Sequence, residues 1–262
     1  MPKIYDNIEN HLTRVLNETL ELSQRTDFCV GYFNLRGWKE IADKIDSLSG
    51  DNVNEGKDDF YRICRLLVGM QKLPIDILRD YFRTKDDHIF DQSEAVKLKK
   101  RLAQEFKEQL TIGIPTDADE QALRKLSQQM KDKKVVVKLH LRYPLHAKLY
   151  LAYSDDKRVP VVGFLGSSNL TLAGLAKQGE LNIDVMDQDA ANKLANWFDD
   201  RWNDRWCIDI TKELIEVIDN SWAADRLLSP YYIYLKMAYH LSQEARAGLN
   251  EFKIPLAFRK EL

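Results

Sequence analysis

The chain has 262 residues and a formal net charge of −2, and 44% of its residues are hydrophobic and 10% aromatic. This composition supplies the core of one α/β domain, alone or with an appendage, and it excludes a disordered chain. The charge balance excludes a general attraction to polyanions, and no apolar run approaches the ~20 residues that cross a membrane as a helix. The N-terminal residues lack the apolar stretch of a signal peptide, so we expect a cytoplasmic protein without a membrane partner.

The first half of the chain alternates helical and extended patterns. Residues 8–23 carry an apolar stripe at helical spacing that runs from Leu12 to Leu20, and residues 27–33 form an apolar run that predicts a buried strand. Three further elements are expected here: a helix over 37–48, a polar loop over 49–59 and a strand over 61–68.

The second half opens with helix-forming sequence over 74–110, broken near 84–90. The elements that follow are a helix over 117–130, strands over 135–141, 145–153, 159–165 and 181–186, and helices over 188–205 and 210–222. Strands that are followed by covering helices predict the fold class α/β, with a mixed β-sheet flanked by helices on both faces.

Two short segments on one expected β-hairpin carry reactive side chains. His146 and Lys148 begin the first arm, and Ser167 and Asn169 follow the second arm after Gly166. A turn centred between residues 156 and 157 would place His146 opposite Ser167, and alternation along a strand would put His146 and Lys148 on one face. Each segment alone is ordinary, because Gly-Ser-Ser-Asn is also a common turn or helix cap. Their order and spacing together predict a phosphate-ester site with a nucleophile, a fixed cation and neutral donors.

At these residues the chain resembles the phospholipase D superfamily, whose signature is His-x-Lys, an Asp five residues after the Lys, and Gly-Ser-x-Asn. The match covers His146, Lys148, Ser167 and Asn169, whereas Tyr153 occupies the position of the Asp. The connection to the Gly is six residues longer than usual. An even insertion keeps each side chain on its original face, so we expect the hairpin to tolerate it.

The resemblance implies a two-step displacement without a metal or another cofactor. His146 would attack phosphorus and form a phosphohistidine, a second His would protonate the leaving oxygen, and Lys148 and Asn169 would bind the non-bridging oxygens with support from Ser167. Glu180 resembles a supporting carboxylate of single-motif nucleases in this superfamily, and it is expected to bind the His146 ring. Because the chain has one motif, the resemblance also implies a homodimer that pairs two motifs.

Basic residues gather between residues 124 and 148 with a single acidic residue, Asp132, among them. Lys138, His140 and Arg142 belong to this stretch and are candidate substrate-binding residues beside the motif; His140 has the alternative of a structural role. The run indicates either a local positive field that attracts a phosphate backbone or the solvated end of a helix.

Residues 28–37 resemble the opening strand of phospholipase D-like domains that precede bacterial Swi/Snf-type helicases, and residues 229–237 resemble the helix that joins such domains to the helicase. We therefore expect a nuclease domain over 1–225 and a helical extension or linker over 226–262 toward a helicase region in the same or a neighbouring chain. The function implied is a phosphodiesterase that cleaves nucleic acid, DNA before RNA, in bacterial defence or repair. The alternative is a non-catalytic module of a helicase that binds nucleic acid and dimerises.

Overall fold

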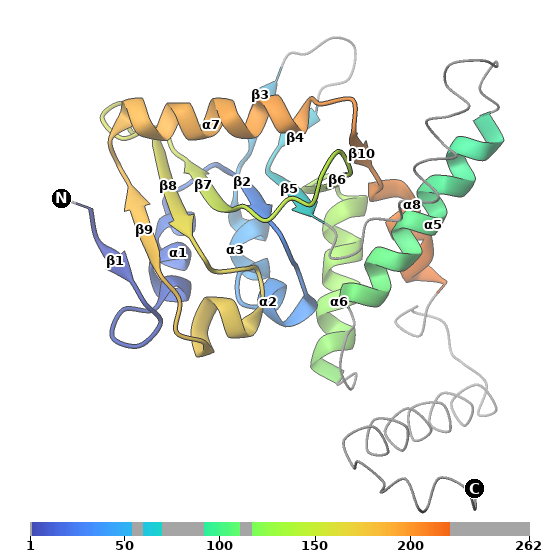
Figure 1. Ribbon diagram of the computed structural model, residues 1–262, viewed down its shortest axis with the longest axis horizontal. Coiled ribbons are helices and arrows are strands. Elements are labelled where there is room, and N and C mark those ends of the chain that lie inside the picture. The colour runs from blue at the N-terminus through green and yellow to red at the C-terminus, as the bar shows by residue number, and fades with distance from the viewer. Residues whose placement is uncertain (1, 54–59, 70–91, 111–116, 221–262) are drawn as a thin grey trace, which may run out of the picture. The chain divides into compact units, whose positions relative to one another are not determined.

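The computed structural model describes residues 2–53, 60–69, 92–110 and 117–220, and every statement below refers to these residues. They form an eight-stranded mixed sheet with the strand order β1-β9-β8-β7-β2-β5-β6-β10 (Figure 1). In that order the strands are Ile4–Tyr5, Asn182–Val185, Val161–Gly166, Lys148–Tyr153, Arg25–Val30, Cys64–Gly69, Val135–His140 and Cys207–Asp209. β2, β5 and β6 are parallel to one another, and the other neighbouring pairs are antiparallel.

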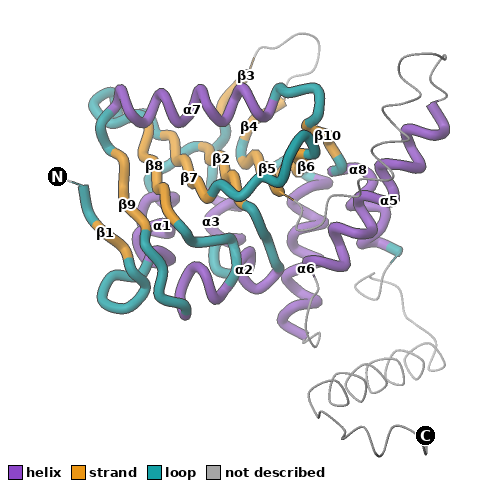
Figure 2. Tube along the Cα trace, in the orientation of Figure 1, coloured by secondary structure: helices purple, strands orange, loops and turns teal. Residues whose placement is uncertain are grey.

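The helices cover both faces of this sheet, as the sequence predicts (Figure 2). They are α1 Leu12–Glu21, α2 Leu35–Lys39, α3 Ala42–Ser47, α5 Gln92–Leu110, α6 Asp117–Lys131, α7 Gln188–Trp202 and α8 Thr211–Asp219, with a π-helical turn η1 at Ala173–Lys177. A separate two-stranded ribbon pairs β3 (Asp51–Val53) with β4 (Phe60–Arg62).

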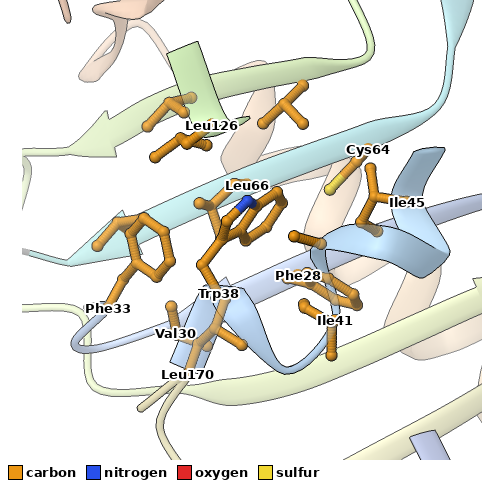
Figure 3. Close-up of a cluster of buried hydrophobic side chains, with 14 of the residues drawn as sticks. Phe28, Val30, Phe33, Trp38, Ile41, Ile45, Cys64, Leu66, Leu126 and Leu170 are labelled. Atoms are coloured by element: carbon orange, nitrogen blue, oxygen red, sulfur yellow. The ribbon is translucent and has the colours of Figure 1, made fainter. Parts of the chain in front are cut away.

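Side-chain alternation along β2 divides the core between the two faces. Phe28 and Val30 point into the larger cluster, where they meet Trp38 and residues of α1, α3 and α6 (Figure 3). Cys29 points the other way, into a cluster built with Phe198 and other residues of α7. Because both faces are covered, β5 is buried along its whole length and β2 is buried after Arg25, and the ends of these two strands support the candidate site.

Several elements differ from the expected ones. The first helix begins at Leu12, because the Asp6 carboxylate accepts three backbone N–H groups from residues 8–10 and forms a turn there. The expected helix over 37–48 is two short helices, α2 and α3. The strands β1, β3 and β10 are too short to show a periodic pattern; β1 and β10 were not expected, and β3 lies within the expected polar loop over 49–59.

The expected hairpin register is wrong by one residue. Leu149 lies opposite Leu165, so the pairing centres on Lys157 and not between residues 156 and 157. The cause is a five-residue loop, which the Ser154 N–H closes by donating to the Pro160 carbonyl oxygen at 3.0 Å. The pairing ends at Leu149 and Leu165, so the motif residues lie beyond the ladder.

The boundary expected at residue 225, the extension over 226–262 and the helix-forming sequence over 74–91 lie outside the described residues and stay predictions. Within the described residues, no helix is long and apolar enough to cross a membrane.

Candidate active site

His146 lies on a loop that crosses the ends of two strands. The loop over residues 141–147 leaves β6 and enters β7, and these strands are separated in the sheet by β5 and β2 (Figure 1). A Cβ atom added to Gly69, at the end of β5, would lie 2.1 Å from the Leu145 oxygen. One added to Gly31, just after β2, would lie 3.0 Å from His146 Cδ2. The loop therefore rests on two glycines, and the His146 side chain is exposed above them.

Lys148 lies directly beneath His146. Its side chain is buried, and its Nζ is 2.7 Å from His146 Nδ1 and donates to the His146 carbonyl oxygen at 2.7 Å. An ammonium group can only donate, so Nδ1 accepts and the neutral ring carries its proton on Nε2. Burial lowers the pKa of Lys148, and the nearby Glu180 carboxylate opposes that shift. The expected proximity of His146 and Lys148 is confirmed.

Asn169 reaches the same region from the other motif segment. Its Oδ1 accepts the Tyr32 backbone N–H at 2.9 Å, and Tyr32 follows Gly31, on which His146 rests. This hydrogen bond sets the orientation of the carboxamide. The amide nitrogen Nδ2 is left as the donor that a phosphoryl oxygen can accept from.

Glu180 contacts Ser167 where the sequence expects it to contact His146. The Ser167 hydroxyl donates to the Glu180 carboxylate and accepts the Leu181 N–H at 2.9 Å. The described residues show no Glu180–His146 hydrogen bond, because Ser167 and Leu181 hold Glu180 beside β9. Glu180 still acts on the site through its charge, since it lies close enough to Lys148 to affect the pKa of that ammonium.

Ser168 is structural. It is fully buried, its Oγ accepts from Asn182 Nδ2 at 2.8 Å, and its carbonyl oxygen accepts from Tyr150 at 2.9 Å. The alternative of a Ser168–Asn169 helix cap is wrong, because η1 starts at Ala173 and its preceding turn is bonded by Thr171. These contacts fix the backbone on which Ser167 and Asn169 are mounted.

The three candidate residues of β6 and its following loop lie apart from this cluster. Lys138 donates to the Trp202 carbonyl oxygen at 3.1 Å, and burial lowers its pKa. His140 is 1% exposed, packs edge-on against Tyr143 and has no hydrogen-bond partner on either ring nitrogen. β6 is two strands from β2, about 10 Å at the usual strand spacing. The substrate-binding roles expected of Lys138 and His140 stay predictions.

The basic run is largely neutralised. Five of its basic residues form ion pairs with acidic side chains at distances up to 3.6 Å: Arg124, Lys125, Lys131, Lys134 and Arg142. Arg142, the third candidate substrate-binding residue of the run, pairs with Asp204 at 3.1 Å and is more than half exposed. Of the two interpretations, the structure favours paired, solvated helix and loop surface over a concentrated positive field.

Tyr153, at the position of the family's Asp, lies at the far end of β7. Five residues separate it from Lys148, which is about 17 Å along a strand. There the buried Asp27 carboxylate accepts from Arg65 at 2.5 Å and from Arg25 at 3.0 Å, and Arg25 lies 3.4 Å from the centre of the Tyr153 ring. Burial and Asp27 raise the pKa of Tyr153. A neighbouring strand thus provides a carboxylate in this region.

Residues 70–202 match the family model described as cardiolipin synthase, PLD-like domain. The match spans half of the chain and includes His146, Lys148, Ser167, Asn169 and Glu180. The chain belongs to the phospholipase D superfamily. Its β2 strand and Gly31 lie before the matched residues, and sequence reasoning did not assign them a role at the site. The available signal was a glycine placed directly after a buried strand.

Three solved structures resemble this member of the superfamily. Nuc of Salmonella typhimurium, a phospholipase D family member, is 11% identical with a TM-score of 0.44, over 80% of this chain and 97% of that one. NucT of Helicobacter pylori is 14% identical with a TM-score of 0.44, over 80% and 98%. Phosphatidylserine synthase of Haemophilus influenzae Rd KW20 is 15% identical with a TM-score of 0.43, over 81% and 40%. No curated protein sequence matches the chain.

Within the described ranges, no three His, Cys, Asp or Glu side chains are grouped to hold a metal ion. Cys29, Cys64 and Cys207 are free thiols. Burial raises the pKa of Cys29 to about 12, so its thiol stays protonated at neutral pH.

Proposed function

We propose that this protein is a phosphodiesterase that hydrolyses nucleic acid, with DNA as the first substrate to test, through a phosphohistidine. The observation that carries the proposal is the meeting of an exposed imidazole, a buried ammonium and an oriented carboxamide from two separate segments: His146, Lys148 and Asn169. Membership of the phospholipase D superfamily supports phosphodiesterase-type chemistry at this place. His146 and Ser167 are exposed on the surface, and a polymer can reach such a site from outside.

The reaction proceeds in two displacements. A ring nitrogen of His146 attacks phosphorus, and the bond from phosphorus to the leaving oxygen breaks as that oxygen takes a proton from a second imidazole. Water then gives its proton to the second imidazole and attacks the phosphohistidine, so the P–N bond breaks and both rings return to their starting states. Lys148 and the Asn169 Nδ2 group neutralise and bind the non-bridging oxygens during both steps.

Substrate binding also prepares the nucleophile. Without substrate, Lys148 donates to His146 Nδ1 and occupies a lone pair of the ring. A phosphodiester oxygen carries negative charge and is a stronger acceptor than a neutral imidazole, so the ammonium turns to it. The Nδ1 lone pair is then free, and the neutral ring can hold its one proton on either nitrogen while the other nitrogen presents its lone pair to phosphorus. Lys148 thereby couples phosphate binding to activation of His146.

The second imidazole comes from a second copy of the chain, because the described residues place a single His beside Lys148. An exposed apolar patch beside the site fits this partner. Leu165 pairs across strands with Ile183, which pairs with Ile4, so the three share one sheet face, and Leu181 precedes Ile183 by two residues. Their exposed fractions are 40%, 39%, 56% and 64%. The Leu181 N–H bonds Ser167, so a two-fold contact that covers the patch brings two motifs together.

The test is incubation of the purified protein with plasmid and single-stranded DNA in excess EDTA. We expect cleavage that survives chelation and disappears in His146→Ala, while His11→Ala, which removes another exposed histidine, cleaves as wild type does. Bis(p-nitrophenyl) phosphate reports the chemistry without a polymer. Cleavage that EDTA abolishes contradicts the mechanism, and cleavage by His146→Ala contradicts the site. DNA binding without cleavage identifies the protein as the non-catalytic module instead.

A further inference from the structure

Residues 31–37, which run from the end of β2 into the first turn of α2, lie against both halves of the motif. Gly31, at their start, lies under the His146 loop: a Cβ there would be 3.0 Å from His146 Cδ2, 3.2 Å from His146 Cα and 3.2 Å from the Leu145 oxygen. Gly31 does not have a positive φ, so the requirement is for space and not for a special backbone conformation. The absence of a side chain lets the nucleophile's backbone lie directly on the strand end.

The same segment holds the second motif half a few residues later. The Tyr32 N–H donates to Asn169 Oδ1 at 2.9 Å, and the Asn34 N–H donates to the Leu170 carbonyl oxygen at 3.1 Å. Gly37 continues this contact, because a Cβ there would lie 2.4 Å from the Leu170 oxygen. The Asn34 side chain accepts the Gly37 N–H at 3.0 Å and fixes the turn between these contacts. Residues 32–37 thus run beside residues 169–170 at backbone distance.

We propose that residues 31–37 form a positioning segment that sets the separation and orientation of His146 relative to Asn169. Along the chain, the two motif halves are joined through β7, the turn and β8, a path of more than twenty residues; across the sheet, the β7–β8 ladder and the hydrogen bond from Tyr150 to Ser168 link their flanks. Their shortest connection through contacts is Gly31 and Tyr32, adjacent residues of a third element. The Tyr32–Asn169 contact is a hydrogen bond, the space above Gly31 is too small for a side chain, and the strand that precedes them is buried on both faces. A displacement of this segment relative to either motif half therefore changes the gap that the phosphate must fill.

The proposal rests on the proposed function for its catalytic meaning, but its geometric content is independent of any activity. Misplacement of a reacting group by about 1 Å costs up to about 100-fold in rate. A methyl group on Gly31 requires the His146 loop to shift by several tenths of an ångström, because a 3.0 Å contact is too short for carbon atoms. It leaves the Asn169 side of the segment in place. The expected effect is a loss of kcat, about tenfold or more, with KM changed less than threefold.

The experiment compares Gly31→Ala, Gly37→Ala and the matched control Gly163→Ala. Gly163 lies in β8 of the same sheet, and a Cβ there would meet only side-chain atoms at 3.4 Å or beyond, an ordinary contact. Carbon–proton and nitrogen–proton NMR spectra record the His146 ring and the Asn169 side-chain amide. We expect Gly31→Ala to shift the ring signals and Gly37→Ala to shift the amide, and Gly163→Ala to shift neither.

Wild-type protein provides a measurement that does not depend on any variant folding. The Gly31 α-protons and the His146 Hδ2 proton should give a strong nuclear Overhauser effect, and its absence would overturn the proposal. Unmoved His146 ring signals in folded Gly31→Ala, or a kcat equal to that of wild type, would also overturn it. If wild type hydrolyses no phosphodiester while the ring signals move as expected, the proposed function fails and the positioning role stands.

Discussion

Restoring the family's acidic residue by Tyr153→Asp should destabilise this chain without increasing its activity. Tyr153 is 9% exposed and its ring lies under the Arg25 guanidinium at 3.4 Å. Replacing a buried aromatic ring with a small side chain costs about 3–5 kcal/mol of unfolding free energy. An ion pair between Arg25 and the new carboxylate returns about 1–2 kcal/mol, because Asp27 already binds Arg25 and Arg65. The net loss should be about 2–3 kcal/mol.

The measurements are urea unfolding curves and steady-state rates on one set of samples. A loss of 2–3 kcal/mol corresponds to a fall in Tm of about 5–10 °C for a domain of this size. The rate should stay within about threefold of wild type, because about 17 Å separates residue 153 from Lys148 and salt screens charges beyond about 8 Å.

Tyr153→Phe is the matched control. It keeps the ring beneath Arg25 and removes only the hydroxyl, so it should cost at most about 1 kcal/mol. A Tyr153→Asp protein that unfolds at the wild-type urea concentration would refute the packing argument. One with a several-fold higher kcat would show that the missing Asp matters for catalysis and that the distance argument fails.

Four further outcomes are expected. Asn169→Asp keeps the bond from Tyr32 but removes the amide donor, so kcat should fall about 100-fold or more, with folding unchanged by circular dichroism. Glu180→Gln should lower kcat at least tenfold with DNA affinity in filter binding nearly intact, and equal kcat would remove Glu180 from the mechanism. Burial lowers the pKa of His140, so as the pH falls this histidine is protonated in the unfolded chain before it is protonated in the folded protein. The unfolding free energy should therefore fall as the pH drops through about 6.5, and His140→Phe should reduce this fall in urea titrations. Leu181→Asp should yield monomers with little activity in sedimentation and rate assays, whereas Leu22→Asp, at a leucine that is even more exposed, should not.

Local patterns were sufficient to predict most elements and part of the site. The stripe in α1, the apolar run of β2 and the helix near α6 are periodic enough to be read from sequence. The proximity of His146 and Lys148 followed from their spacing of two. The periodic elements and the His146–Lys148 pair depend on residues close together in the chain, where the spacing determines which way the side chains point.

Contacts between distant segments could not be predicted in the same way. The hydrogen bond from Tyr32 to Asn169 and the ion pair from Arg65 to Asp27 depend on which strands are neighbours in the sheet. The order β7-β2-β5 brings residues 27, 65 and 153 together, and no period in the sequence specifies that order. The pairing expected between Glu180 and His146 came from a resemblance, and the contact with Ser167 was decided by the path of β9.

The long turn of the hairpin also affects the register of the two strands differently from what its even length predicts. Evenness was expected to preserve the faces of the two arms, yet the observed register is one residue away from the expected pairing. Each arm is fixed from outside the hairpin: β7 pairs with β2 over six residues, and β8 pairs with β9 over four. A change in turn length therefore acts at the end remote from the site, where Ser154 and Pro160 close the loop, and the arms stay bound to their outer neighbours. The motif tolerates a long connection because the sheet, and not the turn, holds its two halves.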